Sequence, residues 1–370
     1  MMNNQELQQA IVDALTQHNS YLQRLSSHAV NEILAQLDGL SLEMLNQLRN
    51  LLEDLSEAEL TALSGAKYTT PQLKEVQSIL DTWQHSLMVS LPEVFVVSAV
   101  ALAAYEASYI YRLAGKKPPR LNGEKLYKSA SKTPYAGGHL LDYIFPGIAA
   151  DLRKKVEYVL RDGIANGQTN QQIIQRIKGR KALNYQDGLL NQTRNIIDAE
   201  VRTARAHISS NTYLETWQAL GFEYTKDVAT LDFRTTSVCM SRDGRVQKIG
   251  AGHQATPYHF RCRTNQVGCD KDGDISGLRP FVASDKRVKD IPKDQRDGII
   301  GQVDANTSYK EWFARQDADH QRSVLGDARY KLYKDGKYSI DKFVDPLSGR
   351  KFTIAELREM DEQTFRNMGL

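Results

Sequence analysis

Apolar residues recur at helical spacing through the first 68 residues of the chain. Between residues 41 and 55, leucines follow one another three or four positions apart behind Ser41, a residue type that caps helices. Ser56 and Glu59 then form the S-x-x-E pattern of a capping box. The pattern predicts a succession of short helices over residues 4–68, with a break near Asn19. We expect the leucine face to pack within the chain, and bundling with a second protein is the alternative.

A second apolar segment begins at Thr70-Pro71, where Thr suits the N-cap and Pro the first helical position. Its most apolar part, from Val94 to Tyr105, contains twelve uncharged residues. As a helix they span roughly 18 Å, short of a hydrocarbon core of about 30 Å. We therefore expect a buried central helix that ends at Gly115, and no membrane span.

Helical spacing returns between residues 142 and 220. Thr169 suits the N-cap of one helix, and a longer helix is expected from about Gly188 to Leu220. The charged residues of the longer helix are Asp198, Glu200, Arg202 and Arg205. A solvated face is the expectation for them, and a catalytic face is the alternative. Residues 222–230 alternate as a strand does.

Composition places the chain among ordinary globular proteins. Its 370 residues suffice for two or three domains, and 41% are apolar, which excludes wholesale disorder. The net charge of +3 excludes a polycation, so contact with nucleic acid must come from a local patch. Three cysteines are too few for a disulfide framework, which indicates a reducing compartment. The first residues lack the pattern of a secretory signal.

The strongest local charge lies in residues 116–140, which we interpret as a linker. Pro118-Pro119 disfavours helix here, and up to residue 132 one acidic residue, Glu124, stands against six basic residues. The candidates for contact with double-stranded DNA are Lys116, Lys117, Arg120, Lys125, Lys128 and Lys132. A solvated connector is the alternative interpretation.

Sulfur and imidazole groups gather in residues 230–269, which contain all three cysteines and two of the eight histidines. Thiolate and imidazole are the usual ligands of zinc, and a structural site needs four. The candidate ligands are Cys239, His259, Cys262 and Cys269. No C-x-x-C pair is present, because Thr236 stands three positions before Cys239. The alternative is that the cysteines are small buried residues and His259 bonds across a loop.

The same stretch admits a catalytic interpretation. Asp232, Cys239 and His259 are the residue types of a nucleophilic Cys/His/Asp site. Asp243 with His259 is a combination suited to a metal-dependent nuclease. A zinc-dependent nuclease or a transferase-like toxin domain is therefore the alternative function.

Residues 230–263 also carry an ordered series of short motifs. They read Thr230-x-Asp232-x-Arg234-Thr235, then Cys239, Asp243-Gly244 and Pro257-x-His259-x-x-Cys262-Arg263. This order resembles the phage Mu-type minor head proteins, also called the head morphogenesis proteins. With the Thr169 helix start and the long helix reaching Gly221, the resemblance covers residues 145–270. The signature residues are Asp232, Arg234, Thr235, Asp243, Gly244 and Pro257.

The chain departs from that family's pattern at two positions. The family often has cysteine where this chain has Thr236 and Thr264, which gives C-x-x-C and C-R-C. Both departures remove ligand positions that the resemblance implies. We therefore expect no cofactor, and zinc is the alternative.

The expected fold is α+β and predominantly helical. A helical region over residues 1–115 is followed by the linker. A core over residues 141–270 comes next, and it ends in a small β-containing Cys/His knob, residues 230–269. A small α/β or helical segment covers residues 271–370. Residues 271–305 are expected to be loop-rich, and Tyr309, Trp312 and Phe313 to anchor a small core.

The resemblance implies a non-enzymatic function in procapsid assembly. Such a protein is a minor component of a tailed bacteriophage head, present in multiple copies and associated with the portal vertex. The implied partners are the portal protein, the major capsid or scaffolding protein, and double-stranded DNA bound without sequence specificity. The resemblance also implies that the protein is packaged or ejected together with the DNA. The implied location is the virion, and the host cytoplasm during assembly.

Overall fold

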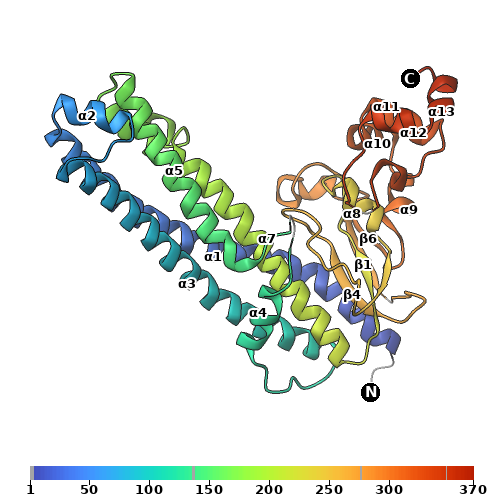
Figure 1. Ribbon diagram of the computed structural model, residues 1–370. Helices are drawn as coiled ribbons and strands as arrows, with labels where there is room; N and C mark the ends of the chain where they lie inside the picture. The colour runs from blue at the N-terminus through green and yellow to red at the C-terminus, as the bar shows by residue number, and fades with distance from the viewer. Residues whose placement is uncertain (1–3, 136–137, 276, 347) are drawn as a thin grey trace. The chain divides into compact units, whose positions relative to one another are not determined.

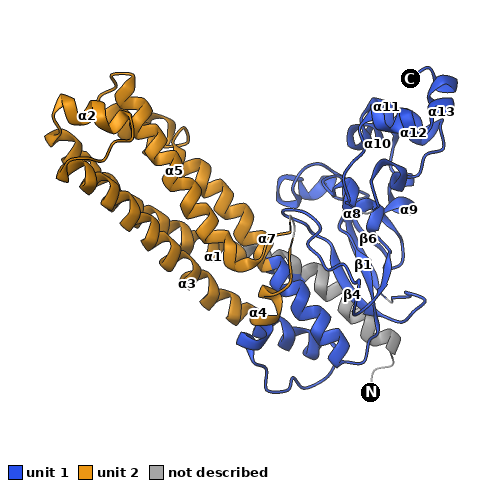
Figure 2. Ribbon diagram, in the orientation of Figure 1, with its two compact units in different colours: residues 1–22, 103–126, 206–370 blue, residues 23–102, 127–205 orange. Residues whose placement is uncertain are grey.

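The computed structural model describes residues 4–135, 138–275, 277–346 and 348–370. It is predominantly helical with two small sheets, which confirms the expected α+β class (Figure 1). The chain divides into two compact units, each built from separate stretches (Figure 2). The sheet unit contains residues 1–22, 103–126 and 206–370, and the helical unit contains residues 23–102 and 127–205. The predicted division into four consecutive segments stays a prediction.

Helices make up most of the described part of the chain up to residue 219. They are α1 (Asn4–Asp54), α2 (Glu57–Ser64), α3 (Pro71–Leu113), α4 (Gly123–Ser131), α5 (Ile144–Ala165), α6 (Asn170–Lys178) and α7 (Leu189–Ala219), with 3₁₀ turns at Leu141–Tyr143 and Lys181–Leu183. The capping box of Ser56 and Glu59 begins α2, as predicted. Thr169 and Gln172 form a second box at α6. These local signals correctly predicted where α2 and α6 begin, whereas Ser41, also expected to cap a helix, lies inside α1.

The succession of short helices predicted over residues 4–68 is wrong up to residue 54, because α1 is continuous there. Its interior has no proline, and Leu37, Leu45 and Leu48 are buried along one face. Packing of such a face stabilises a helix more than single residues of low propensity weaken it. The predicted break near Asn19 therefore does not form.

Helix α3 buries one face and exposes the other. Leu87, Leu91 and Phe95 are buried, whereas Val97 is 70% exposed. The expected burial of the central helix therefore holds for one face. By length and composition α3 is able to cross a membrane, with 33% of its most apolar window buried. One such helix is weak evidence for a membrane span, since core helices of soluble proteins can have the same length and composition.

The charged residues of α7 make contacts within the helical unit. Arg202 donates from Nε to Asp198 Oδ1 at 2.8 Å, which confirms the expected pair. Glu200 accepts a hydrogen bond from the Tyr135 hydroxyl at 2.6 Å. Arg205 is buried and donates to Ser98 Oγ at 3.1 Å, so the solvated face expected for all four residues is wrong at Arg205.

Two three-stranded sheets form the centre of the sheet unit. Their elements are β1 (Tyr224–Val228), β2 (Leu231–Asp232), α8 (Ser237–Arg242), β3 (Val246–Lys248), β4 (Asn265–Cys269), β5 (Leu278–Val282) and β6 (Ile300–Asp304). The first sheet has the order β3-β1-β4 and is antiparallel. The second has the order β2-β5-β6, in which β2 runs parallel to β5. The strand predicted over residues 222–230 is confirmed as β1.

Short helices complete the sheet unit and enclose an aromatic core. They are α9 (Tyr309–Ala314), α10 (Ala318–Leu325), α11 (Asp327–Lys334), α12 (Ile354–Met360) and α13 (Glu362–Met368), with 3₁₀ turns at Val288–Asp290, Lys293–Gln295 and Ile340–Phe343. Tyr309, Trp312 and Phe313 lie in this core, as predicted. The loop-rich character expected for residues 271–305 overlooked β5 and β6, because Pro280 and the glycines weaken the strand pattern there.

Candidate functional site

The Cys/His cluster is assembled by one short helix and one loop of the sheet unit. Cys239 lies in α8, whose N-cap is Thr236. His259 and Cys262 lie in the loop before β4, where Cys262 N donates to His259 O at 3.1 Å. Arg261 between them has a φ of +58°, in the left-handed region. The H-x-x-C spacing therefore forms the local turn that was predicted.

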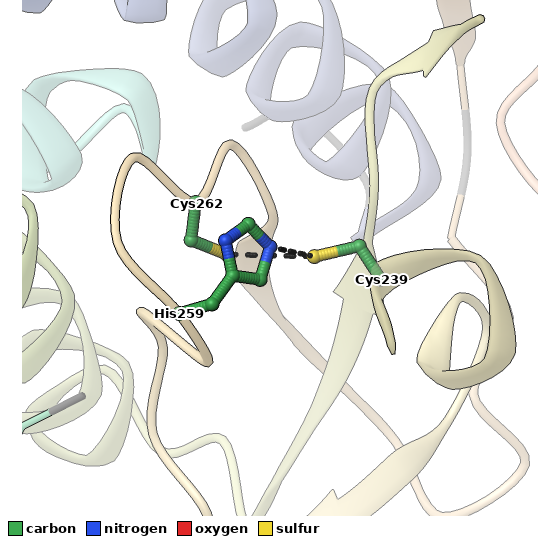
Figure 3. Close-up of side chains that lie close together, drawn as sticks. All are labelled: Cys239, His259 and Cys262. Carbon is green, nitrogen blue, oxygen red and sulfur yellow. Dashed lines mark hydrogen bonds between the residues drawn. The ribbon is translucent and has the colours of Figure 1, made fainter. Parts of the chain in front are cut away.

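Three of the four predicted ligands point toward one another (Figure 3). Cys239 Sγ lies 3.1 Å from His259 Nε2 and 3.5 Å from Cys262 Sγ. All three ligand atoms lie within 4.8 Å of one another. His259 Nδ1 lies 2.8 Å from the Phe260 carbonyl oxygen, which only accepts hydrogen bonds. Nδ1 therefore carries a proton, and Nε2 faces the sulfur atoms.

The two sulfurs of the cluster differ in their affinity for protons. The hydrogen bond with Cys262, followed by burial, raises the pKa of Cys239. The same bond lowers the pKa of Cys262 well below its usual range against the effect of burial, and His259 adds to this. Burial lowers the pKa of His259, but the hydrogen bond and charge of Cys262 outweigh it and raise that pKa. The cluster thus favours one thiolate, shared by the Cys239–Cys262 pair, beside an imidazole.

This geometry fits a zinc ion with three protein ligands. Ligand bonds of about 2.3 Å to sulfur and 2.0 Å to nitrogen place tetrahedral ligand atoms roughly 3.5–3.8 Å apart. The observed separations of 3.1 and 3.5 Å need a small expansion to reach those values. Thr236 Oγ1 lies 2.8 Å from His259 Nε2, but a neutral hydroxyl is not a usual zinc ligand. A bound ion would therefore keep one position open.

Cys269 does not join the cluster, contrary to its inclusion among the four predicted ligands. Cys269 lies in β4 opposite Tyr224 of β1, and it is buried against Ile110 and Trp217. Burial raises the pKa of its thiol to about 12. Cys269 therefore behaves as a small apolar core residue.

Asp232 is used within the fold rather than presented to solvent. It is buried and accepts two hydrogen bonds from Arg263, at 2.5 and 2.7 Å. Thr235 Oγ1 donates to it at 3.1 Å, and the Arg234 backbone and side chain bind it at 3.0 and 3.2 Å. These partners outweigh burial and lower the pKa of Asp232. The predicted Asp232/Cys239/His259 constellation therefore lacks a carboxylate available to act as a base.

Asp243 has a comparable structural position. Its carboxylate is buried and accepts hydrogen bonds from the Ala229 and Tyr309 backbone amides, both at 2.6 Å. The buried Arg279 pairs with it at 3.0 Å. Gly244 follows with a φ of +82°, which glycine adopts without strain. The last signature residue, Pro257, is buried, and the peptide bond between Thr256 and Pro257 is cis.

A pocket of about 180 Å³ opens beside the Cys/His cluster. Its lining residues are Thr230, Arg234, Thr235, Thr236, Cys239, His259, Phe260, Arg261, Arg263 and Thr264. The buried Thr264 hydroxyl has no partner at hydrogen-bonding geometry, although its proximity offsets part of the rise in the pKa of Cys239. Arg234 was predicted as a signature residue, and Thr264 was considered only as a position where the family often has cysteine. Arg261 was not predicted, although it directly precedes Cys262 in the sequence.

No family model, curated protein or solved structure matches the chain at a significant level. The resemblance to the head morphogenesis proteins therefore stays a prediction that rests on the quoted motifs. What the structure adds is the position of each signature residue. Asp232, Thr235, Asp243 and Gly244 hold the loops around the two sheets.

The six basic residues predicted to contact DNA are exposed. The first three, Lys116, Lys117 and Arg120, lie in an irregular segment, and the remainder lie in or next to α4. The predicted linker therefore contains a helix. Asn122 Oδ1 accepts a hydrogen bond from Lys125 N at 3.0 Å and thereby caps the start of α4. Asparagine is a common N-cap residue, so the sequence contained a signal for this helix.

A larger cavity of about 520 Å³ lies in the helical unit and includes none of the predicted site residues. Its lining residues include Tyr135, Tyr143, Gly147, Ile196 and Glu200. These residues come from α5, α7 and the segment before α5, so helical spacing alone did not bring them together.

Proposed function

We propose that this chain is a non-enzymatic minor head protein of a tailed bacteriophage that acts in procapsid assembly at the portal vertex. The motif order over residues 145–270 supports the family, and the fold supports a structural role. In this proposal the partners are the portal protein and the major capsid or scaffolding protein. The protein is located in the virion, and in the host cytoplasm during assembly.

One observation carries the structural role: the signature carboxylates are bound within the chain. Asp232 and Asp243 are buried, and each is bonded to an arginine and to at least one backbone amide. A general base or a metal ligand of a nuclease must instead present its oxygen atoms to substrate or ion. The nuclease or toxin-like alternative therefore has less support from this geometry than an assembly role.

Isolation of particles tests the proposal. Affinity capture of this chain from infected or induced cells should co-purify the portal protein in constant proportion. Purified heads should contain several copies of the chain, and comparison of intact with DNA-emptied particles reports whether it leaves with the DNA. Heads that assemble normally and lack this chain would contradict the proposal.

A structural zinc ion in the knob is a second proposal, and the convergence of Cys239, His259 and Cys262 supports it. An ion there would join α8 to the loop before β4, and thereby stabilise the knob. Its ligands would be two thiolates and one neutral imidazole. The open position would face the 180 Å³ pocket.

Metal analysis with two matched cysteine variants tests the zinc proposal. The native chain and Cys269→Ser should each retain about one zinc per chain after dialysis, whereas Cys262→Ser should retain none. Thr236→Cys should raise zinc affinity, because it places a thiol in the N-cap position next to His259. Equal retention by the two serine variants would refute the site. Zinc-dependent nuclease activity that Cys262→Ser abolishes would instead favour the enzymatic alternative.

A further inference from the structure

Cys239 and Cys262 place two free thiols side by side. Their Sγ atoms lie 3.5 Å apart, and both residues are buried. They pack in one apolar cluster with Tyr258, whereas Cys269 belongs to a different cluster. The two sulfurs of a disulfide lie about 2.0 Å apart, so an approach of about 1.5 Å would join Cys239 to Cys262. The fold therefore selects one pair among the three cysteines.

The surroundings of the two cysteines allow this approach. Cys239 comes from α8, and Cys262 from the irregular loop before β4 (Figure 3). Phe260 in the same loop is 45% exposed, so a rotation of the Cys262 side chain and a small shift of the loop meet little resistance from packing. Cys239 also lines the pocket of about 180 Å³, and Cys262 does not. A small oxidant that enters the pocket therefore reaches Cys239 first.

We propose that Cys239 and Cys262 are a redox-active pair that closes into a disulfide when a small hydroperoxide enters the pocket. The Cys239 sulfur attacks one peroxide oxygen, the O–O bond breaks, and the thiol proton leaves with the departing oxygen as water, which gives a sulfenic acid. The Cys262 sulfur then attacks the Cys239 sulfur and the S–O bond breaks. The departing hydroxyl takes the Cys262 proton and leaves as a second water. The sulfurs together lose two electrons, and the peroxide oxygens gain them.

Closure of the pair has two consequences. A disulfide has no thiolate left to bind a metal ion, so the oxidised pair and a zinc ion exclude each other. The second consequence rests on the proposed head function, in which the chain is made in a reducing cytoplasm and then leaves the cell in a particle. Disulfides persist outside the cell, so the link between α8 and the loop before β4 forms in the released particle. The pair itself depends neither on zinc nor on the head function.

Thiol counting in the full chain tests the proposal. The chain is dialysed against a chelator, treated with hydrogen peroxide, and then unfolded and alkylated. Reactive thiols should fall from three to one, and peptide mass spectrometry without reduction should find Cys239 joined to Cys262. Dithiothreitol should restore all three thiols. A chain oxidised after unfolding in urea is the control, because Cys269 is closer to Cys262 in the sequence and competes once the fold is lost.

Single variants test the order of the two steps. Cys262→Ser should stop the reaction at the sulfenic acid, which dimedone traps on Cys239. Cys239→Ser should react more slowly than Cys262→Ser, because it removes the sulfur that lines the pocket. Cys269→Ser is the matched control and should form the disulfide at the native rate. The mapping in the native chain remains decisive if a variant does not fold.

Three results would overturn the proposal: a native chain that keeps all three thiols, a disulfide that contains Cys269, or oxidation of Cys239 to the sulfinic acid without a disulfide. Failure of the zinc proposal is distinguishable, since a chain that retains no zinc but forms the Cys239–Cys262 disulfide supports the pair. A chain that retains zinc but forms no disulfide after chelation refutes the pair alone. Heads that lack this chain would contradict the head function and leave the thiol counts unchanged.

Discussion

At the scale of single residues, Asp243 holds together parts of the sheet unit that lie far apart in the sequence. Its oxygens accept hydrogen bonds from Ala229, Arg279 and Tyr309. These partners follow β1, lie in β5 and begin α9, respectively. One side chain thus connects both sheets to the aromatic core.

Asp243→Asn is expected to lower the free energy of unfolding by about 3–5 kcal/mol, because it leaves the buried Arg279 without its charged partner. The side-chain NH₂ of the new asparagine would also lie against a backbone N–H, of Ala229 or Tyr309, which in the native chain donates to a carboxylate oxygen. Urea titration followed by circular dichroism measures the change. Asp327→Asn is the control, since the Asp327 side chain is 91% exposed. Similar unfolding midpoints for the two variants would contradict the structural role.

Asp227 in β1 is a second buried carboxylate, with a different electrostatic balance. Tyr258, Gln266 and Arg245 donate to it at 2.7, 2.9 and 3.1 Å. Burial nevertheless outweighs these contacts and raises the pKa of Asp227 to about 6. The folded chain therefore keeps this proton at pH values where the unfolded chain has lost it.

The stability difference between the native chain and Asp227→Asn should therefore depend on pH. Between about pH 4 and pH 6 the unfolded state releases the proton first, so the native chain should lose stability relative to Asp227→Asn as the pH rises. The expected loss is on the order of 3 kcal/mol, with a plateau above about pH 7. Urea midpoints of both chains across this range measure it. A difference that stays constant, or that moves the other way, would show that Asp227 ionises normally.

The sequence predicted three members of the Cys/His cluster but also included Cys269. Spacing along the chain selected His259 and Cys262 correctly, because a local turn brings them together. Only strand register decides that Cys269 faces the core beside Trp217. The pocket of about 180 Å³ beside the cluster was not predicted for a similar reason, since its lining residues come from segments on both sides of α8.

At the scale of elements, local capping signals were better predictors than the breaks inferred between helices. Ser56 and Thr169 each begin a helix with a complete capping box, whereas the predicted cap Ser41 lies inside α1. The continuity of α1 depends instead on the buried face that it packs against other helices, and that packing is not visible in a short stretch of sequence.

Two glycines of α5 provide a matched test of packing. Nothing lies within 4 Å of a Cβ built at Gly147, so Gly147→Ala should stabilise the helix by about 1 kcal/mol. A Cβ at Gly163 would lie 2.5 Å from Ile173 Cγ1, so Gly163→Ala should destabilise by about 1–3 kcal/mol through overpacking of α5 against α6. Denaturant midpoints should shift in opposite directions. Shifts of the same sign would mean that the contact between α5 and α6 is not as described.

At the scale of the whole molecule, the near-neutral charge makes any affinity for DNA a local property. Six exposed cations occur within residues 116–132, and phosphate contacts of this kind depend on salt. Fold class followed from the sequence, because helical periodicity dominates it. The assembly of each unit from separated stretches did not, because it depends on contacts between distant residues.

Replacement of the six basic residues by glutamine should therefore reduce the salt dependence of duplex binding. Each lost phosphate contact lowers the slope of log affinity against log salt by about 0.9. Fluorescence anisotropy with one duplex at several salt concentrations measures it. The control replaces the exposed Lys286, Arg287, Lys289 and Lys293 by glutamine. Equal slopes for the two variants would exclude residues 116–132 as the DNA contact.

The connections of Asp243 also bear on the order in which the chain is synthesised. Asp243 leaves the ribosome 36 residues before Arg279 and 66 residues before Tyr309. A nascent chain that has reached residue 270 contains every residue of the family signature but lacks both of these partners. The knob is therefore expected to close only after α9 has emerged, and a protein fragment truncated at residue 270 should aggregate or be degraded rather than fold.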